Sequence, residues 1–109
     1  MADYPFYRGA YRGDSIPQEE FPRLAARAEA QLARYKRMYR VAAPDENAED
    51  MALCAMADAL YCFEQAQGGG SVSIGSVTES RPALSPREQA AELYRSAGLY
   101  LRMYRGVTG

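Results

Sequence analysis

The chain of 109 residues contains no histidine and only two cysteines. Histidine is the side chain whose ordinary pKa lies closest to neutral pH, so its absence removes the usual general base. The carboxylates are scattered and show no spacing typical of a metal site. We therefore predict that the protein is not an enzyme and has no metal site and no cofactor.

The two cysteines, Cys54 and Cys62, stand in one segment of helical pattern. A rise of about 1.5 Å per residue separates them by roughly 12 Å along a helix axis. A disulfide requires Cα atoms within about 7 Å of each other, so these two cannot pair within that helix. We expect two buried free thiols, which agrees with a reducing compartment.

The sequence also lacks long apolar runs and an excess of charge of one sign. No run approaches the length that crosses a bilayer, and the first residues have no apolar core of a signal peptide. A net charge of −1 gives no general attraction to nucleic acid or to anionic membranes. We expect one small domain over residues 1–109, made in a cytosol-like compartment, with no membrane contact.

Three segments near 17–40, 46–67 and 86–104 have helical periodicity, which predicts an all-α three-helix bundle. Ser15 can cap the first segment. The apolar stripe of that segment consists of Phe21, Leu24, Ala25, Ala28, Leu32, Tyr35 and Tyr39. The pattern indicates one buried face, with arginines on the opposite face.

The second segment is apolar on nearly every side, since Asp58 is the only charged residue between Met51 and Phe63. Such a helix is typical of the centre of a domain, covered on more than one face. Asp58 has two interpretations: a general base with a perturbed pKa, or an acid paired with an arginine of another helix. We favour the arginine pair.

The third segment opens with Ser85, Pro86, Arg87 and Glu88, a capping box with proline at the first helical position. Its predicted stripe consists of Ala90, Leu93, Tyr94, Ala97, Tyr100, Leu101 and Tyr104. Gly98 weakens the helix, and close approach of another backbone is the usual reason for such a glycine. The motif Arg-Met-Tyr-Arg ends both the first and the third segment, at 37–40 and 102–105. Arginines at these ends complement the helix dipole.

The N-terminal residues carry four aromatic side chains without helical or strand periodicity: Tyr4, Phe6, Tyr7 and Tyr11. Aromatic rings are costly to leave in water. We expect this segment to pack across the domain or onto a neighbouring molecule.

Between the second and third helical segments, residues 68–85 have the composition of an extended arm. The alternation of serine with valine and isoleucine suits a short β-strand or hairpin, which would need an edge to pair with. Two interpretations stay open: an assembly element that pairs with another copy or a partner, and a surface loop. The residues assigned to such contacts are Ser71, Val72, Ser73, Ile74, Gly75, Ser76 and Val77.

Arginine and tyrosine alternate at the ends of the first and third helical segments. These residues can grip phosphates and stack on bases, and they are also enriched at protein interfaces. Because acids balance the bases, we favour protein interfaces. The candidate interface residues are Tyr4, Phe6, Tyr7, Tyr11, Tyr39, Arg40, Tyr104 and Arg105.

Four stretches, taken in order, resemble the small head–tail connector (adaptor) proteins of tailed bacteriophages and prophages. They are the N-terminal pattern of residues 6–28, the alanine-rich stretch 52–60, the serine–valine arm at 71–80, and the C-terminal residues 99–107. The resemblance spans nearly the whole chain. One departure is that the arm, at 78–82, lacks the aromatic end found in many members.

The resemblance implies a helical structural protein of the virion neck, assembled in the host cytoplasm as a ring of identical copies beneath the portal. Its implied partners are further copies of itself, the portal protein and the next neck or tail protein. DNA passing through the ring would be contacted without sequence specificity. The alternative is a small helical nucleic-acid-binding or regulatory protein encoded by a prophage.

Overall fold

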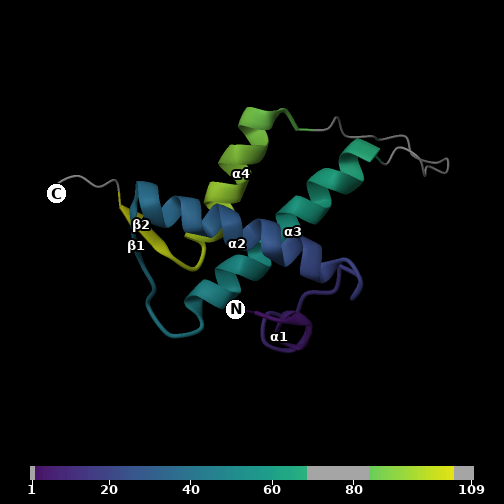
Figure 1. The fold of residues 1–109 in the computed structure, drawn as a ribbon, viewed down its shortest axis with the longest axis horizontal. Helices are drawn as coiled ribbons and strands as arrows, with labels where there is room; N and C mark the ends of the chain where they lie inside the picture. The colour runs from purple at the N-terminus through teal and green to yellow at the C-terminus, as the bar shows by residue number, and fades with distance from the viewer. Residues whose placement is uncertain (1, 69–83, 105–109) are drawn as a thin grey trace.

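The computed structural model describes residues 2–68 and 84–104 of the chain (Figure 1). The described elements, in chain order, are α1 (Tyr4–Gly9), α2 (Phe21–Met38), β1 (Arg40–Ala42), α3 (Ala48–Gly68), α4 (Pro86–Gly98) and β2 (Arg102–Tyr104). The protein is mainly helical, as the sequence predicts, and α2, α3 and α4 are the three expected main helices. The arm residues 71–77 and Arg105 lie outside the described residues.

Helix α3 forms the centre of the fold and lies between α2 and α4 (Figure 1). Its apolar residues are buried along most of its length, including Leu53, Met56, Leu60 and Phe63. Alanines at 52 and 57 are fully buried, and such small side chains let neighbouring helices approach closely. The prediction that this helix is the most enclosed is confirmed.

Helix α2 begins at Phe21, four residues later than the predicted start at 17. Residues 17–20 form a turn, in which the Glu20 amide donates to the Pro17 carbonyl over 3.0 Å. Ser15 does not cap the helix, because the helix begins only at Phe21, with Glu20 at the N-cap position. The predicted stripe of α2 is otherwise confirmed: from Phe21 to Tyr35 every member is buried.

Helix α4 starts as predicted. The Ser85 side chain accepts from the Glu88 amide over 3.2 Å, and the Glu88 carboxylate accepts from the Ser85 amide over 2.9 Å. The helix ends at Gly98 and not at 104. A Cβ added at Gly98 would meet no atom within 4 Å, so the expected close approach of a backbone is wrong.

The two Arg-Met-Tyr-Arg motifs differ in structure: α2 ends within the first, at Met38, whereas the second follows the end of α4 at Gly98 and forms β2. Residues Arg40–Ala42 and Arg102–Tyr104 pair as an antiparallel two-stranded sheet, with Arg40 opposite Tyr104. The chain leaves α2 at Met38 and α4 at Gly98 to make this pairing. Arg37 stands in the last turn of α2, as predicted. The predicted helix end is wrong for the second motif, because Arg102–Tyr104 form a strand that pairs with the strand starting at Arg40.

Met56 tests the role of the central helix. Its side chain is fully buried, so Met56→Ala should lower the free energy of unfolding by about 2–5 kcal/mol through lost burial and a residual cavity. Urea denaturation followed by circular dichroism measures the change. Leu99→Ala is the control, because Leu99 is 71% exposed and its truncation should change stability by less than about 0.5 kcal/mol. Equal effects of the two substitutions would contradict the assignment of α3 as the core.

Candidate functional site

The N-terminal segment packs across the domain. Helix α1 begins after Asp3, whose carboxylate accepts from the Phe6 amide over 3.0 Å. Tyr7, on the inner face of α1, has no exposed surface. Its ring stacks with Tyr11 at 5.7 Å between centroids and lies 5.2 Å from the ring of Phe21 on α2. The aromatic residues at the start of the chain thus complete the hydrophobic core.

The Tyr7 hydroxyl makes three hydrogen bonds that join three parts of the chain. It donates to the Asp58 carboxylate of α3 over 2.7 Å. It accepts from the backbone amides of Ser15 and Ile16, each over 3.0 Å. The hydroxyl of Tyr7 therefore connects α1 and the following loop to the central helix α3.

The loop after α1 fits closely around Tyr7. The Gly13 amide donates to the Tyr7 carbonyl over 2.8 Å. A Cβ added at Gly13 would lie 2.3 Å from Cε1 of the tyrosine ring, so only glycine fits there without movement. Arg12 just before it has a positive φ of 64°, an uncommon conformation for a residue other than glycine. The tight turn brings Ser15 and Ile16 to the hydroxyl.

Asp58 is partnered by tyrosines and not by an arginine, so the predicted ion pair is wrong. The carboxylate accepts a hydrogen bond from the Tyr7 hydroxyl, and the ring of Tyr11 stacks beside Tyr7. Burial raises the pKa of Asp58, and the neighbouring tyrosine hydroxyls oppose the rise. Burial and the bond to Asp58 in turn raise the pKa of Tyr7 to about 12. The carboxylate acts here as an acceptor that holds the N-terminal segment in place.

The other site residues proposed from the sequence differ in how exposed they are to solvent. Cys54 is buried, and burial raises the pKa of its thiol to about 12. Cys62 is exposed, so the prediction of two buried thiols is wrong for it; it lies on the solvent side of α3. Of the N-terminal aromatics, Tyr7 is enclosed within its own chain, so its assignment as an interface residue is wrong. Tyr4, Phe6 and Tyr11 are half-buried against the core.

The remaining interface candidates gather at the far end of α2. Tyr39 is half-buried, Arg40 is exposed, and Tyr104 is 48% exposed on the paired strand. Tyr39 lies 5.4 Å from Tyr94 of α4 and 6.1 Å from Tyr35, between ring centroids. An aromatic cluster thus links the C-terminal half of α2 to α4.

A groove runs between α2 and α4 beside this cluster. It consists of two adjoining hollows of about 390 and 350 Å³ that share Gln31 and Arg34. The lining residues are Arg27, Ala30, Gln31, Arg34, Tyr35, Arg37, Met38, Tyr39, Leu60, Ala90, Ala91, Leu93 and Tyr94. We call this the α2–α4 groove. Ala90 and Tyr94, predicted to lie on the buried stripe of the third helix, are exposed instead and line it.

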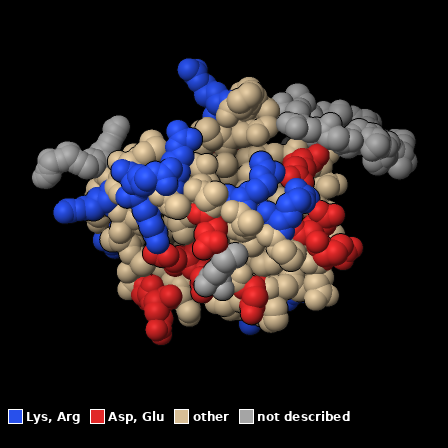
Figure 2. Space-filling view, viewed as in Figure 1, with Lys and Arg blue, Asp and Glu red and all other residues tan. Residues whose placement is uncertain are grey.

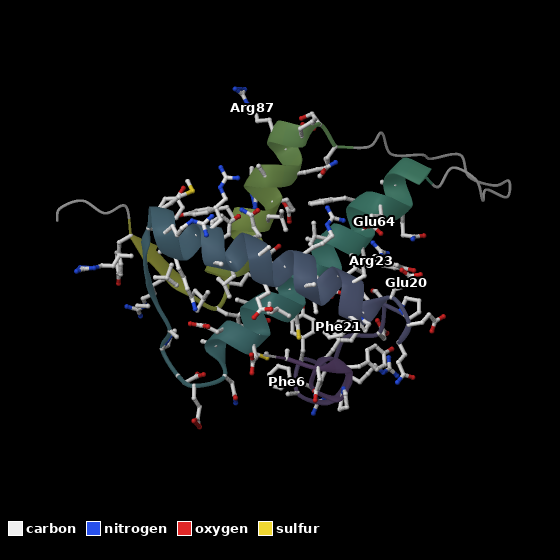
Figure 3. All side chains as sticks on the ribbon, viewed as in Figure 1. Phe6, Glu20, Phe21, Arg23, Glu64 and Arg87 are labelled. Atoms are coloured by element: carbon white, nitrogen blue, oxygen red, sulfur yellow. The ribbon has the colours of Figure 1, made fainter. Side chains whose placement is uncertain are left out.

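The N-terminal half of α2 carries arginines that are already paired. Arg23 and Arg27 both contact Glu64 of α3 at 2.7 Å, and Arg23 also contacts Glu20 (Figure 3). The hydrogen bond from Arg23 and the charge of both arginines lower the pKa of Glu64. Sequence reasoning missed this cluster, since nothing local marks a contact between two helices.

The described part of the chain offers neither a cluster of metal ligands nor a membrane-spanning helix. Within residues 2–68 and 84–104, acidic and cysteine side chains do not gather in groups of three or more that could hold a metal ion. None of the helices in those ranges is both long enough and apolar enough to cross a membrane. Comparison with known proteins found no matching family model, no matching curated protein and no matching solved structure.

Tyr7→Phe removes the hydroxyl while keeping the ring. Two amides of the loop and the Asp58 carboxylate then lose a partner, and each unsatisfied buried group costs about 1–3 kcal/mol. We expect a loss of about 2 kcal/mol or more in the free energy of unfolding, measured by urea denaturation. Tyr104→Phe, at an exposed position, is the control and should leave stability nearly unchanged. A Tyr7→Phe protein as stable as the parent would show that the hydroxyl does not anchor the segment.

Asp58→Asn tests the carboxylate by pH. Because the folded-state pKa of Asp58 is raised above the ordinary 3.8, the folded protein binds this proton more tightly than the unfolded chain. The stability from this group is full below pH 3.8 and is lost as pH rises through the raised folded-state pKa. Asparagine keeps an oxygen for Tyr7 but does not titrate. The stability of the parent relative to the variant should therefore fall between acid and neutral pH, measured by urea denaturation of both. If the stability of the parent relative to the variant stays constant or rises between acid and neutral pH, the burial of the Asp58 charge is contradicted.

Proposed function

We propose that the chain is a structural protein of the phage neck that assembles as a ring of identical copies below the portal. The proposal rests on the resemblance of four stretches of the sequence to head–tail connector proteins. The helical fold is compatible with that resemblance. In the proposed role the protein catalyses no reaction and contacts DNA only without sequence specificity.

The observation that best supports a role in assembly is the distribution of exposed apolar side chains. In the described part of the chain, the large exposed ones are Met38, Leu84, Tyr94, Leu99 and Tyr104. All belong to the C-terminal end of α2 or to the segment 84–104, around α4 and the strand pair (Figure 1). Exposed apolar side chains gathered in one region are typical of protein interaction surfaces.

The buried polar groups support a structural role as well. The carboxylate of Asp58, which could have served as a base, accepts a hydrogen bond from the Tyr7 hydroxyl. Among the described residues, no buried side-chain nitrogen or oxygen lacks a hydrogen-bond partner. A polar group that binds a substrate is often without a hydrogen-bond partner in the free protein. The described core contains no such unpaired polar group.

The alternative, a small nucleic-acid-binding or regulatory protein, is favoured by the arginines of α2. Arg34 and Arg37 are exposed, and they stand near Tyr35 and Tyr39. Arginine beside tyrosine can hold a phosphate backbone and stack on bases. Tight, sequence-specific binding to a short duplex at physiological salt would support this alternative over the neck protein.

A direct test of the proposal uses tailed particles purified from cells that carry the gene in its native genome. Immunogold labelling and mass spectrometry should find the protein in the particles, at the junction of head and tail. Particles that contain none of it would overturn the neck assignment.

The arm supplies a second test. The triple variant Val72→Ser, Ile74→Ser and Val77→Ser removes the apolar side chains of the arm, and we expect it to abolish assembly into rings. Its matched control is Ser71→Ala, Ser73→Ala and Ser76→Ala, which should assemble as the parent does. Circular dichroism should show the same helical content in all three proteins, and native mass spectrometry measures the assembly. If the triple variant of Val72, Ile74 and Val77 assembles normally, the arm is only a surface loop.

A further inference from the structure

Two of the three arginines that line the α2–α4 groove have no ion-pair partner among the described residues. Arg23 and Arg27 pair with Glu64, and Lys36 pairs with Glu49. Arg34 and Arg37, one turn apart on the wall of the groove, form no ion pair with any described residue. The groove therefore presents two uncompensated charges to a ligand.

Much of the groove lining is apolar. The buried side chains of Leu60 and Leu93 line one hollow together with Ala30, and Ala90 and Ala91 line the other. A phosphate backbone would satisfy the arginines but leave this apolar surface uncovered. A peptide that carries carboxylates beside small apolar side chains satisfies both. The lining thus favours an acidic protein segment over nucleic acid.

The chain itself contains such a segment. The loop from β1 to α3 reads Ala-Ala-Pro-Asp-Glu-Asn over residues 42–47, and all six residues are exposed. We call it the acidic loop. Asp45 and Glu46 form no ion pair with any described residue, although the Asp45 carboxylate accepts from the Asn47 amide over 2.9 Å. The small apolar residues precede the two acids, in the combination that the groove would accept.

The acidic loop and the groove lie on opposite sides of α2 in one molecule. In Figure 1, α4 lies above α2, and the connection from β1 to α3 lies below α2. In Figure 2, Lys and Arg lie mostly along α2 and above it, whereas Asp and Glu lie mostly level with it or below. The loop of one molecule therefore cannot fill its own groove, but two molecules can bring these surfaces together.

We propose that the acidic loop of one copy docks into the α2–α4 groove of the next, with Asp45 and Glu46 against Arg34 and Arg37. The contact joins two different surfaces, so it is head-to-tail and can be repeated from copy to copy until a ring closes. This inference rests on the proposed ring and names the surfaces that would hold it together.

The experiment uses two charge-reversed proteins. The groove variant carries Arg34→Glu and Arg37→Glu, and the loop variant carries Asp45→Lys and Glu46→Lys. In a sample of either variant alone, the acidic-loop position and the α2–α4 groove carry charges of the same sign. The self-association of each variant should therefore weaken by about tenfold or more. Mixed together they restore opposite charges at every contact, so the mixture should associate as the parent does. Sedimentation velocity at low salt measures all four samples.

The control protein carries Arg8→Glu and Arg12→Glu, the same change of charge on the N-terminal segment. It should associate as the parent does. Salt of about 1 M, which screens charges beyond a few Å, should weaken association of the parent. Restoration in the mixture is the result that a merely unfolded variant could not produce.

Three results would overturn the docking. The first is a parent that stays monomeric at every concentration. The second is single variants that associate like the parent, and the third is a mixture that fails to recover. If the charge variants assemble normally while the Val72, Ile74 and Val77 variant does not, the docking fails and the ring proposal stands. If the groove variant instead loses binding to a labelled DNA duplex, measured by fluorescence anisotropy, the groove serves nucleic acid.

Discussion

The hydrogen bond from Tyr7 to Asp58 is the contact on which the arrangement of the molecule depends. It spans 51 positions in the chain and joins the N-terminal segment to the central helix. Through two further hydrogen bonds, the same hydroxyl holds the loop at Ser15 and Ile16 that leads into α2. The carboxylate of Asp58 thereby holds the N-terminal segment against α3.

Local signals in the sequence predicted the helices well. The capping box at Ser85 acts within four residues, and the near-continuous apolar surface of α3 can only mean burial on several sides. Such features depend on neighbours in the chain, so a single sequence suffices to recognise them. The short helix α1 escaped notice because six residues are too few to show a period.

Contacts between distant segments could not be predicted. Arg40 and Tyr104 pair in two short strands, where the sequence predicted helix ends. The local sequence around either residue does not indicate that the other is its partner. The partner of Asp58 was predicted to be an arginine, since buried acids are usually paired, yet its carboxylate accepts a hydrogen bond from the Tyr7 hydroxyl. Cys62 was expected to be buried because the helix is apolar all round, but one side of α3 near it faces solvent.

We propose that each helical subunit presents two unlike, complementary surfaces. This arrangement is tested most directly by electron cryomicroscopy of the assembled protein. It predicts a ring in which every copy has the same orientation, with the guanidinium groups of Arg34 and Arg37 within about 4 Å of the carboxylates of Asp45 and Glu46 of the neighbouring copy. A symmetric dimer formed by the same face of both copies, or a ring whose α2–α4 grooves stand empty, would contradict it.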